Sequence, residues 1–235
     1  MCRCSQPPNA EKILMTFYVH IVESLAPEEM LYDFAPGRAL TKYLRLCGIP
    51  YQYNNAIDVS SFTKALDARI LEGIRDHGVA PIVHLAMHGS EQGVQLTTQR
   101  ASGNIFSWNQ LSQFLLPIHE HLNRQLVVCM SSCSGMLGHS MANIADGNQV
   151  PFQSLLGFGA NIDWRDLALA YSVFYRRLQA GDDSQNIVNA VQLCSGQSDF
   201  GIVNGELAHR VYAEIRAKQD LEKLRHSLQN VTRNL

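Results

Sequence analysis

Residues 81–90, P-I-V-H-L-A-M-H-G-S, and their counterpart, residues 126–135, L-V-V-C-M-S-S-C-S-G, decide the fold of this chain. Each is a nearly continuous apolar run of strand length that ends in small and reactive residues. Such runs are typical of strands buried on both faces, as in a parallel sheet. Functional residues of parallel α/β sheets gather beyond the carboxyl ends of the strands. We therefore predict two neighbouring central strands, 81–87 and 126–130, that bring His88 and Cys133 side by side.

Outward from these two strands, apolar runs alternate with amphipathic segments. Further strands are expected at residues 13–22, 51–57, 94–97, 155–158 and 200–203. Helices are expected at residues 40–46, 62–74 after a cap at Asp58 or Ser60, 111–118 after a cap at Ser107, 163–179 and 187–193. This alternation predicts the α/β class, as a three-layer α/β/α sandwich with a mostly parallel central sheet.

Composition excludes several classes of protein. The 235 residues are 46% hydrophobic and only 17% charged, which does not suit a disordered chain. The net charge is −2 and no long run of one sign occurs, so we expect no nucleic-acid partner. No apolar stretch approaches the length of a membrane span, and residues 1–12 lack the apolar core of a signal peptide. These features predict a cytoplasmic protein without a membrane partner.

The six cysteines are too few for a disulfide-dense protein, and a cytoplasmic chain keeps its thiols reduced. Cys2 and Cys4 form a C-x-C near the start of the chain. A metal site there would need two more ligands, so we expect no metal and no cofactor.

Three segments are expected along the chain. Residues 1–12 form a flexible tail, residues 13–205 form the α/β domain, and residues 206–235 form a charged helix. Apolar residues of that helix follow a heptad-like spacing, at Leu221, Leu224, Leu228, Val231 and Leu235. The stripe predicts packing either back on the domain or against a helix of a partner.

His88 and Cys133 suit nucleophilic catalysis. A thiolate is the nucleophile, and a neighbouring imidazole can take its proton and later protonate a leaving amine. Gly89 would let a substrate carbonyl approach the backbone, and its amide would pair with that of Cys133 as an oxyanion hole. The small residues Ser132, Ser134 and Gly135 leave this approach open, and Ser131 and Ser132 would contact the substrate. Taken singly, a histidine or a cysteine is more often structural. The residue types alone therefore leave both interpretations of His88 and Cys133 open, whereas Cys129, inside the apolar run, is expected to be structural.

The two strand ends, A-M-H-G-S at 86–90 and S-S-C-S-G at 131–135, resemble in this order the caspase-like (clan CD) superfamily of cysteine peptidases. Residues 163–181, D-W-R-D-L-A-L-A-Y-S-V-F-Y-R-R-L-Q-A-G, are similar to the helix that follows the cysteine strand in CHAT domains. A second helix at 184–194 is expected after it. The resemblance spans about residues 13–205.

This resemblance implies a caspase-like fold and an intracellular cysteine endopeptidase. His88 would be the base and Cys133 the nucleophile, with no third member of a triad. Caspases that cleave after aspartate carry Gln-Ala before the cysteine, where this chain has Ser131 and Ser132. Arg38 could contact an acidic substrate side chain and Asp163 a basic one, although Asp163 also suits an N-cap of the helix after it. We expect a protein or peptide substrate and a regulatory protein partner that controls cleavage.

Two other functions are compatible with parts of this pattern. A caspase-like interaction or scaffold module would keep the fold without catalysis, although it would have no need to keep His88 and Cys133. A glutamine amidotransferase-like enzyme carries its cysteine in a G-x-C-x-G turn. Here Ser131 stands two positions before Cys133, and the histidine precedes the cysteine, so this alternative fits less well.

Overall fold

Alternation of apolar side chains along the strands builds two cores, one on each face of a central sheet. The computed structural model describes residues 17–31, 35–102, 105–144 and 149–233, and the side chains of all of these except 100–102, 144 and 224–233. The strands are β1 (Phe17–Ser24), β2 (Tyr51–Asn55), β3 (Ala80–Ser90), β4 (Gly93–Gln95), β5 (Phe106–Ser107), β6 (Val127–Ser131), β7 (Ser154–Phe158) and β8 (Phe200–Asn204).

The strand order is β2-β1-β3-β6-β7-β8. All neighbours along this path are parallel except β8, which runs antiparallel to β7 at the edge. Two short strands, β4 and β5, extend the end of β3 as an antiparallel ribbon. The predicted mostly parallel sheet is confirmed.

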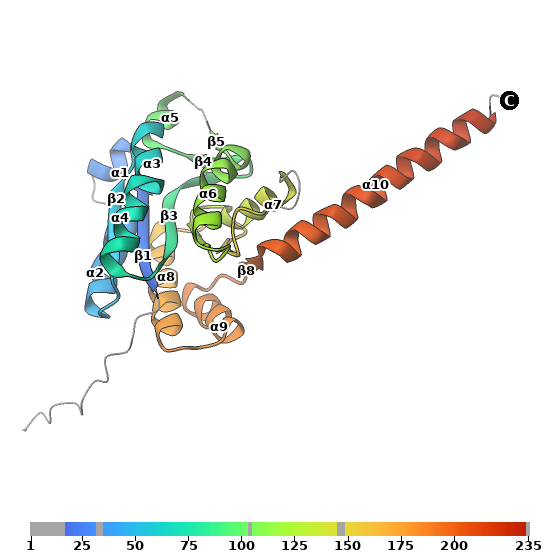
Figure 1. Cartoon of the computed structure of the whole chain (residues 1–235). Helices are drawn as coiled ribbons and strands as arrows, with labels where there is room; N and C mark the ends of the chain where they lie inside the picture. The colour runs from blue at the N-terminus through green and yellow to red at the C-terminus, as the bar shows by residue number, and fades with distance from the viewer. Residues whose placement is uncertain (1–16, 32–34, 103–104, 145–148, 234–235) are drawn as a thin grey trace, which may run out of the picture.

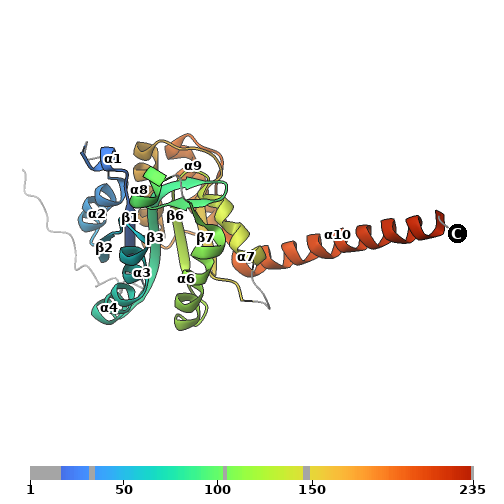
Figure 2. The same ribbon diagram turned by 90° about the horizontal axis from the view of Figure 1, so that it is seen from above.

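Helices cover both faces of this sheet (Figures 1 and 2). One face is covered by α3 (Val59–Leu66), α4 (Ala68–His77), α6 (Trp108–His121) and α7 (Met141–Ile144), and the other by α2 (Pro36–Leu46), α8 (Trp164–Gln179) and α9 (Ser184–Ser195). Along β3, Val83 and Leu85 point to the α3–α6 side, whereas Ile82 and His84 point to the α8 side. The three-layer α/β/α sandwich is therefore confirmed.

Several predicted helix boundaries hold for the expected reason. Asp58 caps α3 and Ser107 caps α6, each in a reciprocal capping box with the residue three positions later. Gly181, with φ 80°, follows the end of α8. The single helix predicted over 62–74 is wrong, because the backbone of Asp67 leaves the helical region and separates α3 from α4.

The segment after β1, for which no helix is predicted, contains a short helix, α1 (Pro27–Leu31). Pro27 occupies its first turn and Glu29 lies two residues later, a pattern typical of a helix start. Three more short helices also lie in segments without a predicted helix: α5 (Thr97–Ser102), the 3-10 helix η1 (Gly135–Ser140) and α7.

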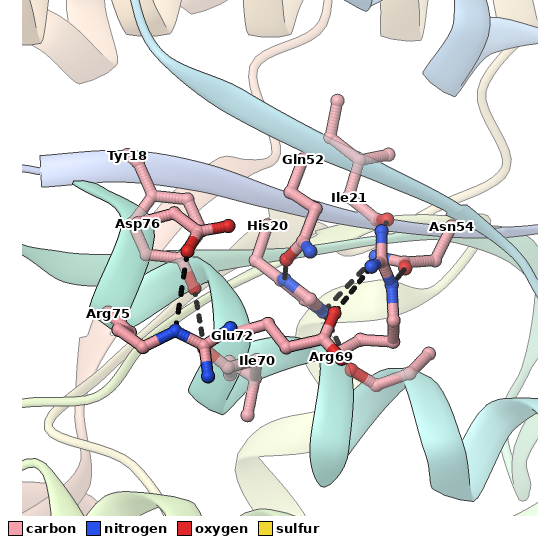
Figure 3. A network of polar contacts seen from close by, with 11 residues as sticks. Tyr18, His20, Ile21, Gln52, Asn54, Arg69, Ile70, Glu72, Arg75 and Asp76 are labelled. Atoms are coloured by element: carbon pink, nitrogen blue, oxygen red, sulfur yellow. Dashed lines mark hydrogen bonds and ion pairs between the residues drawn. The ribbon is translucent and has the colours of Figure 1, made fainter.

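A closed network of polar side chains lies between β1, β2, α3 and α4 (Figure 3). His20 is fully buried, and its ring nitrogens contact Gln52 Oε1 at 2.9 Å and the Ala65 carbonyl at 2.8 Å. Tyr18 donates its hydroxyl to the carbonyl of Ile70 at 3.0 Å. Because these groups are satisfied by one another, His20 has a structural role on the face of the sheet opposite α8.

The last helix, α10 (Gly205–Arg233), begins beside the body and then projects away from it (Figures 1 and 2). Near its start, Tyr212 Oη lies 2.6 Å from His139 Nδ1, and His209 Nδ1 lies 2.8 Å from the Ala142 carbonyl. Its exposed apolar side chains include Leu207, Val211, Ile215 and Leu221. The predicted stripe from Leu224 onward, like the predicted tail 1–12, lies outside the described side chains.

None of the helices in the described part of the chain combines the length and the apolarity that a membrane crossing needs.

The buried histidines predict a loss of stability in acid. Burial lowers the pKa of His20 to about 4 and that of His84 to about 3, from 6.5. Below pH 6.5 these histidines become protonated in the unfolded chain but stay neutral in the folded chain. Stability that is fully present above pH 6.5 is therefore lost as the pH falls toward 4. We expect the free energy of unfolding to fall by about 1.4 kcal/mol per pH unit for each such histidine.

Urea unfolding between pH 7 and pH 4.5 measures this slope. His84→Phe should reduce the slope of the unfolding free energy against pH by the contribution of one histidine. His121→Phe, at the exposed end of α6, should leave the slope unchanged. An unchanged slope in His84→Phe would contradict the prediction.

Candidate active site

His88 and Cys133 stand at matching positions of two adjacent strands. The parallel ladder between β3 and β6 runs from Ile82↔Val127 to Ala86↔Ser131, with a constant offset of 45 residues. His88 and Cys133 have the same offset and lie two residues beyond the last pair. The predicted adjacency of the two strands is confirmed, and the ladder alone brings both residues to one edge of the sheet.

Beyond the ladder the two strands continue into different elements. The end of β3 turns into the β4 hairpin, in which His88 pairs with Gln95 and Gly89 with Val94. After Cys133 the backbone takes a left-handed conformation at Ser134, with φ 53°, and enters η1. The Ser134 amide donates to the Ala160 carbonyl at 3.1 Å, so the loop after β7 holds this turn in place. Non-glycine residues in this conformation often mark functional turns.

The backbones meet most closely at Gly89. A Cβ atom placed there would overlap the carbonyl oxygen of Cys133 and lie 3.0 Å from Ser132 Oγ. We expected glycine here to admit a substrate, but the immediate reason is contact with the chain itself. The main chain of Gly89 therefore lies directly against that of Cys133. Whether their two amides act together as an oxyanion hole stays a prediction.

His88 and Cys133 line one cavity of about 250 Å³. Its other walls are mostly apolar and come from the loop after β1, the end of β3 and the start of α8: Leu25, Pro36, Met87, Ile162, Trp164 and Leu167. Two carboxylates, Glu29 and Asp163, also line it. A second cavity, of about 370 Å³ between α3, α4 and α6, contains neither reactive residue.

Cys133 and Cys129 differ in accessibility. Cys129 is fully buried, and burial raises the pKa of its thiol to about 12, which confirms the expected structural role. Cys133 is only partly buried and faces the cavity. Its thiol donates to the carbonyl of Ile162 at 3.7 Å. Of these two cysteines, Cys133 is therefore the one that can contact a substrate.

His88 contacts a carboxylate that sequence reasoning missed. Its Nε2 lies 2.6 Å from Oε1 of Glu29, on α1. Among the described residues, this is the hydrogen bond that the His88 side chain makes, and no hydrogen bond joins that side chain to Cys133. The sequence signal for Glu29 is the A-P-E-E start of a short helix at residues 26–29, in a segment without a predicted helix.

Ser131 and Ser132, predicted to contact substrate, line the cavity but are almost completely buried. Ser132 Oγ has no hydrogen-bond partner among the described atoms. An unsatisfied buried hydroxyl costs about 1–3 kcal/mol, so its retention beside the cavity suits a ligand-facing role better than a packing role.

Asp163 lines the cavity, but its carboxylate is already engaged. It caps α8 by accepting from the Arg165 amide at 2.8 Å, and the Arg165 guanidinium lies 3.0 and 3.1 Å from its two oxygens. This pairing lowers the pKa of Asp163. The N-cap alternative is thus confirmed.

Arg38 is not among the described residues around the cavity, and its guanidinium lies 6.0 Å from the centre of the Tyr53 ring. The acid beside it is Glu23, a second residue that sequence reasoning missed. Glu23 is fully buried at the end of β1, where burial raises its pKa. It accepts from the Gly37 amide at 2.6 Å and from Tyr53 Oη at 2.6 Å. Glu23 therefore anchors the start of α2, next to the cavity wall at Pro36.

Gly89→Ala should displace the Cys133 peptide, because the new methyl group overlaps the Cys133 carbonyl oxygen. That oxygen belongs to the backbone and cannot move aside by rotating a side chain. We expect a loss of about 1–3 kcal/mol in the free energy of unfolding, typical of overpacking. Gly201→Ala in β8 is the matched control, since its nearest neighbour is the mobile end of Met136 at 3.2 Å. Equal stability of both variants in chemical denaturation would refute the contact.

Within the described residues, no three His, Cys, Asp or Glu side chains gather where they could hold a metal ion. No model of a known protein family matches this chain, and no curated protein matches it. The function is therefore argued from the geometry of the cavity and from the residues quoted above.

Proposed function

We propose that this chain is an intracellular caspase-like cysteine endopeptidase, most similar to CHAT domains, that hydrolyses peptide bonds in protein substrates. The observation that carries the proposal is the equal register of His88 and Cys133 at the ends of adjacent parallel strands, beside one cavity. A partly exposed cysteine and a histidine beside one apolar cavity are the minimum that thiol-dependent acyl transfer requires.

In this mechanism the Cys133 thiol passes its proton to His88, and the thiolate attacks the carbonyl carbon of the substrate. A C–S bond forms, the C–N bond breaks, and His88 returns the proton to the leaving amine. Water then attacks the thioester, with His88 taking its proton, and the acid product leaves as Cys133 regains its hydrogen. The amides of Gly89 and Cys133 would stabilise the oxyanion in both steps.

The cavity favours an apolar substrate residue next to the scissile bond. Its walls include Met87, Ile162, Trp164 and Leu167, whereas Asp163 is paired with Arg165 and Arg38 lies elsewhere. A charged substrate side chain would lose its hydration there without gaining a free partner. We therefore expect apolar residues to be preferred over aspartate, lysine or arginine.

A regulatory protein partner fits the attachment of α10. The segment that follows Cys133, η1 and α7, contacts the start of α10 through the pairs His139–Tyr212, Ala142–His209 and Asn143–Arg216. Binding of a partner along the projecting part of α10 would therefore shift η1 and α7, the segment that follows Cys133. The described cysteines are free thiols, as a reducing compartment such as the cytoplasm maintains.

One observation favours a second candidate function, a caspase-like interaction module without catalysis. The Cys133 thiol and the His88 ring are hydrogen-bonded to other groups rather than to each other. Catalysis requires Cys133 to release the Ile162 carbonyl, and a module that only binds partners would not need this movement.

Labelling with a peptidyl chloromethyl ketone that carries leucine at its reactive end tests both candidates. We expect Cys133 to be modified, with Cys133→Ala unlabelled and His88→Ala labelled at least ten times more slowly, and a fluorogenic peptide library should show turnover after apolar residues. Cys129→Ala serves as the control that should keep full labelling. Equal labelling of wild type and His88→Ala would support the interaction module, and turnover by Cys133→Ala would overturn the choice of nucleophile.

A further inference from the structure

Glu29 uses each carboxylate oxygen for a separate contact. Oε2 accepts from the Ala26 amide at 2.7 Å, the reach-back contact of a capping box at the start of α1. Oε1 lies 2.6 Å from Nε2 of His88. The carboxylate is therefore held by its own helix while it faces the imidazole.

The loop that carries α1 is itself anchored. Ser24 Oγ accepts from the Thr97 amide at 2.9 Å, and Thr97 Oγ1 donates to the Leu25 carbonyl at 2.6 Å. Leu25 and Ala26 are buried. Glu29 therefore lies on an anchored segment at the cavity wall. Its contact with His88 differs in this respect from an ion pair between two mobile surface side chains.

A carboxylate at this distance selects one form of the neutral imidazole. It accepts a hydrogen bond, so the proton resides on Nε2 and the lone pair on Nδ1. Nδ1 has no hydrogen-bond partner among the described residues, and it is then the nitrogen that can accept the thiol proton. Once His88 is protonated, its positive charge lies beside the Glu29 carboxylate, which favours the imidazolium.

We propose that Glu29 is the positioning residue of His88, which it holds in the Nε2–H form with Nδ1 as the base. The proposal rests on the proposed function of the same site, because His88 is the base of that reaction. It replaces the expectation that the dyad needs no third member, and it gives the short helix α1 a defined task.

The tautomer of His88 tests the contact without any need for activity. In the full chain labelled with ¹⁵N-histidine, the His88 signals are identified by their loss in His88→Ala. At pH 8 we expect Nε2 to carry the proton in wild type and in Glu28→Gln, which removes the same charge from the exposed neighbour. In Glu29→Ala we expect the His88 proton to be distributed between Nδ1 and Nε2, so that the ¹⁵N chemical shifts of the two nitrogens become averaged. A wild-type pattern in Glu29→Ala would overturn the proposal.

Kinetics test whether the contact matters for the reaction. Against the best library peptide, kcat of Glu29→Ala should fall by about tenfold or more, a part of the 10²–10⁴ that a general base contributes, with KM nearly unchanged. Glu29→Gln keeps the length and one accepting oxygen, so it should lie between wild type and Glu29→Ala. Unchanged kcat in Glu29→Ala, or an equal fall in Glu28→Gln, would contradict positioning through His88.

Two controls separate the possible failures. Thermal unfolding detects a loss of α1, and Glu29→Gln retains a reach-back acceptor should Glu29→Ala unfold. If wild type shows no turnover or labelling that depends on Cys133, the proposed peptidase fails, and the NMR measurement still decides the Glu29–His88 contact. If labelling depends on His88 but not on Glu29, the peptidase stands and the positioning role fails.

Discussion

The parallel ladder between β3 and β6 is the constraint on which the site depends. Five residue pairs fix a constant offset between the strands, and that offset brings His88 and Cys133 to the same level. The main chain of Gly89 then lies against the Cys133 carbonyl, where only a residue without a side chain fits. A slip of one residue in this register would turn every side chain of one strand to the opposite face and separate the pair.

The two faces of the sheet differ in how their buried polar side chains are hydrogen-bonded and exposed. On the α3–α4 face, His20 and its neighbours satisfy one another in a closed network (Figure 3). On the α8 face, the ring of His84, within the ladder, packs against the rings of Tyr171 and Tyr175. Beyond the ladder a cavity is lined by His88, Cys133 and Ser132, whose hydroxyl has no hydrogen-bond partner among the described atoms. The proposed site therefore lies at the strand ends.

Two attached segments supply what the sheet cannot. The short helix α1 sets a carboxylate against His88, and the long helix α10 contacts the segment that follows Cys133. One contacts His88, the proposed base, and the other contacts the segment after Cys133, the proposed nucleophile. This arrangement would let an external signal on α10 change the position of Cys133 while His88 stays held, which suits an enzyme whose cleavage must be restrained.

The sequence by itself determined the fold class and the pair His88 and Cys133, because buried strands and capped helices have local signatures in apolar runs, Asp58 and Ser107. It did not determine the roles of Glu29, Arg38 or Asp163. A side chain's partner depends on which loops the folded sheet brings together, and Glu29 meets His88 across 59 residues of sequence. The break at Asp67 likewise appears only in the folded backbone, since the apolar spacing of residues 62–74 continues through it.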